Sequence, residues 1–397
     1  MSSHIKKLYE ISQKQHRLII GLMAGTSLDG LDIALCKFTG AAEHTEVSVL
    51  AFETVSFTES QKEPIRRVFA KKEVDFQHLC MLNPWIGNLH SQMILECLAK
   101  WQIDPNTIDA VASHGQTVMH MPARLHGVPD MPNATLQIGD GDHIAVKTGI
   151  ITLSDFRQKH CAVGGEGAPL ALYGDYLIFG SLTENRILIN MGGIANFTYL
   201  PMSMNFDEGF ATDTGPGNTL LDAYVQKHFQ LPFDKDATLA LQGACNEALL
   251  AALKNHPFFK ESIPKTTGPE LFNLAYLDNC LNSLNQKVSK VDVLHTLCKF
   301  TADTLADEIL KSVRIMANTV AYVSGGGAHN PLILSYLSEN IPHIPVKNLN
   351  VLGIDPDAKE AVLFAALANE TLAGDAGFQK PNHQEGRFFM GKISFPA

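Results

Sequence analysis

The first hydrophobic pattern of the chain is two apolar segments on either side of a short polar turn. Residues 18–23 are apolar and rich in β-forming side chains, and apolar positions alternate again from Leu31 to Phe38. Such segments around a turn of Gly, Thr, Ser and Asp predict a β-hairpin. Residues 47–57 predict a third strand. We therefore expect a β-meander before any long helix.

The next third of the chain alternates between helical and strand patterns. Apolar spacing predicts helices near residues 59–72 and 89–102, and a strand at 109–113 that leads into a polar elbow at 114–117. Residues 119–133 then form a loop rich in Pro, Gly and His. Loops of this kind seldom exist for stability alone, so we expect them to carry function.

The second half of the chain repeats the strand, glycine turn and strand order of the first half. The buried strand pattern at 186–190 is followed by a glycine turn and another apolar strand at 197–200, which indicates a weak internal duplication. Apolar residues at helical spacing then predict a long amphipathic helix over 293–317. A short strand at 320–324 ends in a third glycine-rich turn, and the last predicted helix covers 359–372.

Composition narrows the class of protein. A chain of 397 residues with 45% hydrophobic residues is long enough for two lobes. The net charge of −10 argues against nucleic-acid and anionic-membrane partners and favours a small molecule. Seven cysteines without a CxxC pair fit reduced thiols, and no stretch reaches the roughly 18 apolar residues of a membrane span. We expect a cytoplasmic protein whose residues 1–16 are a flexible lead-in.

Three glycine-rich turns, each after an apolar strand, indicate phosphate binding. They lie at 25–32, at 192–193 together with 213–218, and at 325–330. A polyphosphate needs backbone N–H groups aimed at its oxygens, hydroxyl donors beside them, and carboxylates for a metal ion. One such turn is usually only a tight hairpin, but three of them favour nucleotide binding. None fits the Walker or the Rossmann fingerprint.

Eight motifs carry a resemblance to a known family. They occupy residues 21–32, 113–117, 136–140, 155–157, 164–170, 190–196, 213–218 and 324–330. In this order and spacing they resemble the anhydro-N-acetylmuramic acid kinases, over nearly the whole chain from about residue 18 to about residue 372. Two departures stand out: Ala24 replaces the usual Ser, and Glu166 replaces the common Gln.

The resemblance implies an α/β fold with two lobes, the actin-like ATPase fold of hexokinase with ribonuclease H-like duplicated domains and a cleft between the lobes. We expect residues 17–155 to form the first lobe and 156–397 the second. It also implies that water opens the 1,6-anhydro ring of anhydro-N-acetylmuramic acid while ATP phosphorylates O6. The products are N-acetylmuramic acid 6-phosphate and ADP, in cell-wall recycling, and the family suggests a homodimer.

Asp213 is the candidate general base for water. It opens a Gly-Pro-Gly turn after a Gly, Phe, Ala and Thr stretch, so its carboxylate should face the cleft. The alternative is that Asp213 only caps the helix predicted from Thr219 to Phe229.

The nucleotide and its metal ion are assigned to the glycine turns and to three carboxylates. For Mg²⁺, held largely through water, we expect Asp29, Asp32 and Glu360. The resemblance places Glu360 near the metal, whereas on the sequence alone it could equally be a helix N-terminal charge. For Asp32 the alternative is a turn-closing hydrogen bond, and Asp32 could do both. The expected ATP contacts are Gly25, Thr26, Ser27, Leu28, Asp29, Gly30, Leu31, Asp32, Gly192, Gly193, Thr214, Gly215, Gly217, Asn218, Gly325, Gly326, Gly327 and Asn330.

The sugar is assigned to polar residues of the first half. His114 and Gln116 supply neutral donors and acceptors, and Arg157 supplies a fixed cation for the lactyl carboxylate of a muramic sugar. The full set of expected sugar contacts is His114, Gln116, Gln137, Asp155, Arg157, Gly165 and Pro169.

Two rival functions share the predicted fold. A simple hexose kinase would use Asp213 against a free sugar hydroxyl and would not turn over an anhydro sugar. An ATP-driven chaperone or filament protein would need a long substrate domain or polymer contacts, whereas the middle of this chain consists of polar, glycine-rich loops.

Overall fold

The computed structural model describes residues 2–25, 28–314, 317–375, 377–381 and 385–397. The chain divides into two compact units: unit 1 comprises Met1–Ile178 and Asp357–Ala397, and unit 2 comprises Phe179–Pro356. The expected boundary after residue 155 differs from this division. Residues 156–178 stay with unit 1, and the C-terminal segment returns to unit 1 because its helix packs there. The predicted phosphate contacts Thr26 and Ser27 lie outside the described residues.

Unit 1 is built on a mixed sheet with the order β14-β6-β4-β1-β2-β3, and β5 pairs with β4. The β1-β2 and β2-β3 pairs are antiparallel, whereas β4 runs parallel to β1 and β6 parallel to β4. The predicted hairpin and third strand are thus confirmed. The strand bounds are β1 His16–Ala24, β2 Gly30–Thr39, β3 Glu46–Ser56, β4 Ala110–Met121, β5 Ala134–Ile138, β6 Thr152–Ser154 and β14 Lys392–Ser394, with a separate ribbon of β12 Phe378–Gln379 and β13 Arg387–Phe388.

The helices of unit 1 bury apolar faces against this sheet. A cluster of fully buried residues that includes Ile20, Leu22 and Ile94 forms the core between the strands and α3. The long helix α3 starts earlier than predicted, at Phe76, where Asp75 caps its N-terminus. The helix bounds are α1 Ser3–Ser12, α2 Glu59–Arg66, α3 Phe76–Trp101, α4 Ala123–His126, α5 Gly141–Thr148, α6 Phe156–Ala162, α7 Ala171–Phe179 and α13 Lys359–Ala373, with short 3₁₀ helices at Ala42–His44 and Pro105–Thr107.

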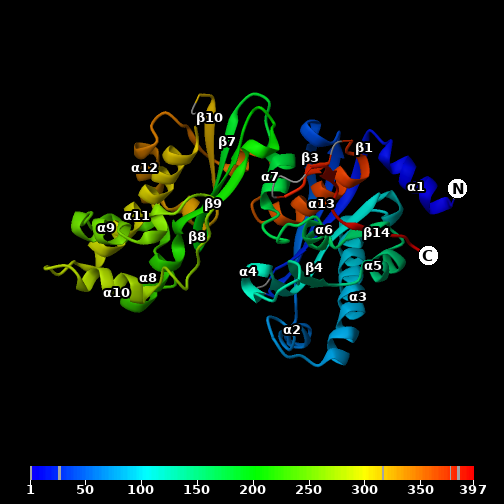
Figure 1. Ribbon diagram of the computed structural model, residues 1–397, viewed down its shortest axis with the longest axis horizontal. Coiled ribbons are helices and arrows are strands. Elements are labelled where there is room, and N and C mark those ends of the chain that lie inside the picture. Colours follow the sequence, from blue (N-terminus) through cyan, green and yellow to red (C-terminus); the bar gives the residue numbers. More distant parts are fainter. Residues whose placement is uncertain (1, 26–27, 315–316, 376, 382–384) are drawn as a thin grey trace. The chain divides into compact units, whose positions relative to one another are not determined.

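The N-terminal segment was expected to be flexible, and that expectation is wrong for residues 3–12. They form α1, which Ser2 caps and which packs against α13 through the buried Ile11. Figure 1 shows α1, at the blue end of the chain, in the same unit as the orange-red α13. A single buried apolar residue is a weak sequence signal, which explains why the polar composition predicted a free segment.

Unit 2 repeats the sheet of unit 1. Its strand order is β11-β10-β7-β8-β9. The β7-β8 and β8-β9 pairs are antiparallel, and β10 and β11 run parallel to β7, which is the pattern of β6-β4-β1-β2-β3. The predicted internal duplication and the duplicated α/β fold are therefore confirmed. The strand bounds are β7 Asn185–Met191, β8 Ile194–Leu200, β9 Phe210–Pro216, β10 Thr319–Ser324 and β11 Val346–Asn348.

The helices of unit 2 enclose a second core around the long helix α11. Leu294, Leu305 and Ile309 of this helix are completely buried, and α11 ends at Ser312 rather than at residue 317. The helix bounds are α8 Asn218–Phe229, α9 Glu247–Lys254, α10 Leu274–Asn282, α11 Lys290–Ser312 and α12 Pro331–Asn340, with 3₁₀ helices at Phe206–Glu208, Lys235–Ala237, Ala240–Gln242, Pro257–Lys260, Gly326–His329 and Leu349–Leu352. Within the described residues, no helix has the length and hydrophobicity that a bilayer crossing requires.

Helix α13 lies directly on β1 at a position without a side chain. A Cβ placed on Gly21 would stand 1.9 Å from the carbonyl oxygen of Ala361 and 3.1 Å from the Cβ of Ala365. Because the nearest atom belongs to the backbone, a side-chain rotation cannot relieve the clash. Glycine at residue 21 is therefore a condition for the seating of α13.

We predict that Gly21→Ala destabilises unit 1 by about 3 kcal/mol or more, because the added methyl pushes α13 away from the sheet. Urea unfolding, monitored by tryptophan fluorescence, measures the loss of stability of unit 1, because both tryptophans, Trp85 and Trp101, lie on its helix α3. The control is Gly127→Ala, where the added carbon meets no atom within 4 Å and only the positive φ of 60° opposes it. Its cost should be about 1 kcal/mol. Equal effects of the two variants would contradict the prediction.

Candidate active site

The predicted phosphate turn of unit 1 is anchored by buried groups on both sides. Leu28 and Leu31 are buried in the core, so their side chains hold the turn and do not face a ligand. Gln116 is fully buried, and its side-chain amide donates to the carbonyl oxygen of Gly25 at 3.1 Å. Gln116, expected at the sugar, thus supports the turn. Strand β4 continues through the predicted polar elbow at 114–117, which is how Gln116 reaches β1.

The carboxylates assigned to the metal ion lie near one another in unit 1. Burial raises the pKa of Asp32 above its ordinary value, and the negative charges of Asp29 and Asp357 raise it further. Desolvation likewise raises the pKa of Glu360, with Asp32 adding to the rise and Arg157 opposing it. A cation would relieve this mutual repulsion. Within the described residues, no three acidic, His or Cys side chains are close enough to bind a metal ion directly.

The two sequence alternatives for these carboxylates have different outcomes. The side chain of Asp32 accepts from the Thr54 hydroxyl at 2.6 Å and so bonds across to β3; the turn that it would close contains residues 26 and 27, which lie outside the described residues. Glu360 lies in the first turn of α13, where the helix dipole favours a negative charge. This helix position does not conflict with a metal-binding role, because Glu360 also lies near Asp32.

A chain of hydrogen bonds links the sugar residues of unit 1. Arg157 donates through Nε to Nε2 of His114 at 2.7 Å and through Nη1 to the carbonyl oxygen of Gly167 at 2.9 Å. His160, which no sequence motif singled out, accepts the Gly167 N–H at 3.0 Å. A Cβ on Gly165 would collide with the His160 ring. Two side chains of α6, Arg157 and His160, therefore hold the carbonyl oxygen and the N–H of Gly167 in the loop at 164–170.

The protonation state of His114 follows from these contacts. Burial, and then the charge of Arg157, lowers the pKa of His114 to about 3. The ring is therefore neutral, with Nε2 as the acceptor for Arg157 and the hydrogen on Nδ1. A neutral imidazole lets the guanidinium keep its full charge, whereas a carboxylate partner would cancel it.

A cavity of about 590 Å³ in unit 1 brings together part of the predicted sugar set. His114, Gln137 and Asp155 are among its lining residues, and Lys392 lies beside Asp155 with an Nζ to Oδ2 distance of 2.8 Å. Arg157, Gly165 and Pro169 are not among the residues that line it. Arg157 reaches this wall through His114, whereas Pro169 is exposed.

The charge that Glu166 adds to the glycine loop has a partner. Arg124 of α4 donates through Nε to both carboxylate oxygens of Glu166, at 3.1 and 3.0 Å. The departure from the common Gln is thus compensated within this chain. A residue 42 positions away supplies the compensation, so local sequence patterns gave no sign of it.

Asp213 of unit 2 lies on strand β9, and it does not cap a helix. Helix α8 begins after Gly217, which makes no side-chain capping bond, so the capping alternative is wrong. The half-buried carboxylate of Asp213 accepts the Thr267 N–H at Oδ2, at 2.9 Å. Burial raises the pKa of Asp213, and the Thr267 hydrogen bond opposes that rise. Thr267 stands 54 positions away, so no local sequence pattern joins it to Asp213.

The glycine motifs of unit 2 converge on one another. Gly193 accepts from the backbone N–H groups of Gly217 and Thr219 through its carbonyl oxygen, and the Asn218 side chain donates to the carbonyl oxygen of Met191 at 3.0 Å. A Cβ on Gly326 would lie 3.2 Å from the Asn218 amide nitrogen. The second and third predicted turns are therefore neighbours.

A cavity of about 480 Å³ lies where these motifs meet. Its lining includes Asn218, Gly326 and Asn330 from the predicted ATP set, together with Phe233 and Asp222. Asn330 also caps α12 with its side-chain oxygen, so its position is fixed. Thr214 is buried and donates to the Ala195 carbonyl oxygen, so it braces β9 against β8 and does not face the cavity.

We predict that the buried neutral His114 makes unit 1 less stable in acid. The pKa of His114 is about 3 in the folded protein, below the unfolded value of about 6.5. The unfolded state therefore takes up a proton first, so the free energy of unfolding is highest above pH 6.5 and decreases as the pH falls. Between pH 7 and pH 5 this loss amounts to about 2 kcal/mol. His114→Gln keeps an acceptor for Arg157 without titrating, so urea unfolding of the variant should lack this part of the pH dependence. Identical pH dependence in both proteins would contradict the assignment.

Comparisons with known proteins agree with this arrangement of motifs. The family model described as "Anhydro-N-acetylmuramic acid kinase" matches residues 17–380. A protein of that name from Pseudoalteromonas atlantica is 52% identical over 403 residues, covering 100% of both chains. Another from Caldanaerobacter subterraneus subsp. tengcongensis is 36% identical, covering 98% of this chain and 99% of the relative.

Solved structures give more distant matches. An activator of 2-hydroxyisocaproyl-CoA dehydratase from Clostridium difficile with bound ADPNP matches with a TM-score of 0.42 and 13% identity, over 89% of this chain and 95% of that one. A ROK family glucokinase from Streptomyces griseus with glucose and AMPPNP matches with a TM-score of 0.34 and 14% identity, over 88% and 98%. On the full-length match to the family model and to relatives of that name, the chain belongs to the anhydro-N-acetylmuramic acid kinase family.

Proposed function

We propose that this protein uses water and ATP to open the 1,6-anhydro ring of 1,6-anhydro-N-acetylmuramic acid and to phosphorylate O6. Asp213 is the general base in this proposal, and the products are N-acetylmuramic acid 6-phosphate and ADP. Membership of the family supports the reaction. The observation that carries the role of Asp213 is its placement: a half-buried carboxylate on β9, held by the Thr267 N–H.

The chemistry needs a proton acceptor for the water that attacks C1. As this water bonds to C1, the C1–O6 bond breaks, and O6 becomes available to take the γ-phosphoryl group of ATP. Burial raises the pKa of Asp213 and makes it a stronger base than an exposed aspartate, and the Thr267 N–H opposes that rise. A positioned carboxylate of this kind contributes a factor of about 10²–10⁴ in rate.

ATP is assigned to the glycine motifs of both units. In unit 2, the cavity beside Asn218, Gly326 and Asn330 is a suitable site for the adenosine. Backbone N–H groups at the glycine turns supply donors for phosphate oxygens. In unit 1, the Gly25 turn is the second phosphate element, and Gln116 holds it in shape.

Mg²⁺ fits the acidic group of unit 1 as a partner held through water. Asp29, Asp32 and Glu360 offer only oxygen ligands, which Mg²⁺ prefers. The negative charge of Asp29 raises the pKa of Asp32, and that of Asp32 raises the pKa of Glu360, so a cation would relieve the repulsion between these carboxylates. The absence of a three-residue cluster within the described residues fits indirect binding. When bound, the ion neutralises charge on the transferring phosphoryl group.

The muramic sugar is assigned to the side of the unit 1 cavity that His114 lines. Arg157 uses Nε and Nη1 to bind His114 and Gly167, and we assign Nη2 to the lactyl carboxylate. The cavity beside His114, Gln137 and Asp155 supplies polar partners for the sugar hydroxyl and acetamido groups.

Two further properties belong to this proposal. A cytoplasmic location is supported by the seven cysteines, which are all free thiols in the structure. A homodimer is proposed from the family resemblance alone.

Incubation with ATP, Mg²⁺ and the anhydro sugar in ¹⁸O-labelled water tests the reaction. We expect the product to carry one phosphate and one labelled oxygen at C1, because water opens the ring. Mass analysis of the product measures both. Phosphorylation of free N-acetylmuramic acid without turnover of the anhydro sugar would instead support the rival hexose kinase.

We predict that Asp213→Asn loses turnover by a factor of about 10²–10⁴ and keeps the affinity for ATP. The amide retains the shape of the carboxylate but cannot accept the proton of water. Coupled ADP release measures turnover, and calorimetry measures nucleotide binding. Unchanged turnover would remove Asp213 from the proposed role.

A further inference from the structure

A buried ion pair in unit 2 has no place in the chemistry described so far. Lys265 and Glu308 are each about 5% exposed, and the Lys265 Nζ lies 2.6 Å from Oε2 of Glu308. Taking two charges out of water costs most of what their attraction returns, so such a pair adds little net stability. A pair of this kind needs another explanation.

The side chain of Lys265 is fixed at several points. Besides Glu308, its Nζ donates to the carbonyl oxygen of Phe258 at 3.2 Å and lies 4.7 Å from the centre of the Phe258 ring. Glu308 is held in turn, because its Oε1 accepts the Ser312 hydroxyl at 2.8 Å, with Lys311 3.7 Å away. Glu308 and Ser312 both lie on α11, the central helix of the unit 2 core.

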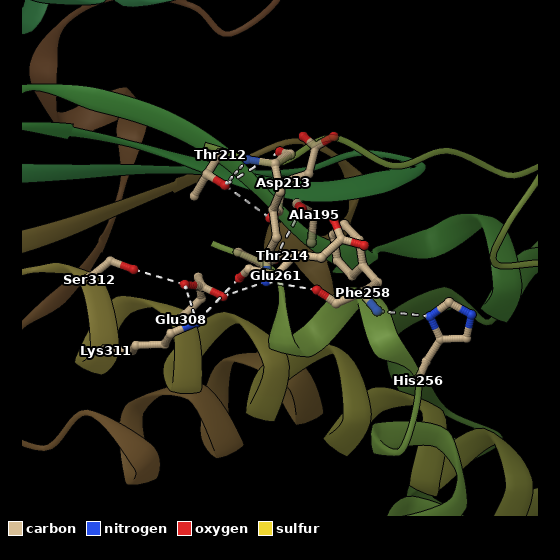
Figure 2. Close-up of polar contacts among 11 residues, drawn as sticks. Ala195, Thr212, Asp213, Thr214, His256, Phe258, Glu261, Glu308, Lys311 and Ser312 are labelled. Atoms are coloured by element: carbon tan, nitrogen blue, oxygen red, sulfur yellow. Dashed lines mark hydrogen bonds and ion pairs between the residues drawn. The ribbon is translucent and has the colours of Figure 1, made fainter. Parts of the chain in front are cut away.

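The backbone of the same segment binds the strand that carries Asp213. The Lys265 carbonyl oxygen accepts the Asp213 N–H at 3.0 Å, and the Lys265 N–H donates to the Thr212 hydroxyl at 3.1 Å. Two residues on, the Thr267 N–H donates to Oδ2 of Asp213 at 2.9 Å. Figure 2 shows Glu308 reaching from its helix toward the contacts around Thr212 and Asp213.

We propose that the Lys265–Glu308 pair is a positioning device for Asp213, fastening residues 265–267 to α11 so that they hold the Asp213 carboxylate. The inference rests on the proposed role of Asp213 as the base. The helix anchors the lysine side chain, the lysine backbone holds the Asp213 backbone, and Thr267 holds one carboxylate oxygen. The other oxygen, Oδ1, is then directed at the water.

This arrangement affects both the geometry and the ionisation of Asp213. Catalytic groups displaced by about 1 Å lose about a hundredfold in rate. Burial raises the pKa of Asp213, and the Thr267 N–H is the group that lowers it. Of the charged groups beside this segment, Glu308 pairs with the Lys265 side chain and Lys311 pairs with Glu308, and neither contributes to the pKa shift of Asp213. Release of the segment should therefore raise the pKa of Asp213 through loss of that hydrogen bond.

The test compares Glu308→Gln with a matched variant on the same helix. Asp303→Asn removes the charge that pairs with Lys299, at 3.0 Å, and with Lys254, at 3.8 Å. Among the described residues, no hydrogen bond or ion pair joins Asp303 to residues 265–267. We expect Glu308→Gln to lower kcat tenfold to a hundredfold and to move the acid limb of the pH profile upward by about one unit. ATP affinity should not change. Asp303→Asn should leave kcat and the acid limb at wild-type values.

A double variant protects the test against misfolding. Lys265→Met with Glu308→Gln leaves no unpaired buried charge, so it should fold about as well as the wild type. We expect it to retain the kinetic defect, because methionine cannot bind the helix residue. Wild-type kcat and acid limb in the double variant, or in Glu308→Gln, would overturn the inference. Asp213→Asn in the same assay separates the two ideas: if that variant is active, the proposed base itself is wrong.

Discussion

The seating of α13 on β1 is the contact on which unit 1 depends. The helix approaches the strand so closely that only glycine fits at residue 21. From this position α13 presents Phe364, whose ring lies 4.7 Å from that of His114 and 5.5 Å from that of Phe156. The first turn of the same helix brings Glu360 near Asp32 and Arg157. One helix from the end of the chain thus organises residues from β2, β4 and α6.

Both units use buried polar groups for placement, and in different ways. In unit 1, a neutral histidine holds Arg157 through a hydrogen bond, so this partner adds no charge of its own. In unit 2, a full ion pair fixes Lys265 to a helix, and hydrogen bonds from the lysine backbone pass that constraint to Asp213. In both units the holding groups are buried: His114 is 3% exposed, and Lys265 and Glu308 are each 5% exposed. Rigidity of this kind keeps reacting atoms in register during catalysis.

Local patterns in the sequence predicted the parts of the structure that local forces decide. The hairpin around residues 25–32, the strand at 186–190 and the helix at 359–372 follow from apolar periodicity and turn residues, and all three are present. The duplication was also visible, because a strand and glycine turn recur. What failed depends on tertiary contacts: the buried Ile11 that orders α1, and the return of α13 to unit 1.

The supporting residues of the site were beyond reach for the same reason. Lys265 and Thr267 lie more than fifty positions from Asp213, and Arg124 lies 42 positions from Glu166, so no motif joins them. Gln116 was assigned to the sugar because its motif is polar, yet its complete burial makes it a brace for Gly25. The roles of Asp213, of the acidic group and of the sugar residues stay predictions.

Because unit 2 is inserted into the chain of unit 1, the two units cannot be completed in the order in which they begin. Residues 179–356 are contiguous, so unit 2 has its whole core as soon as it has left the ribosome. Unit 1 cannot complete its fold until α13 has been synthesised, although its core residues Ile20 and Leu22 are made early. At about 5–20 residues per second, synthesis of the insertion takes roughly 10 to 40 s. During that interval the sheet of unit 1 lacks both α13 and β14, and its apolar face is an aggregation hazard until α13 covers it.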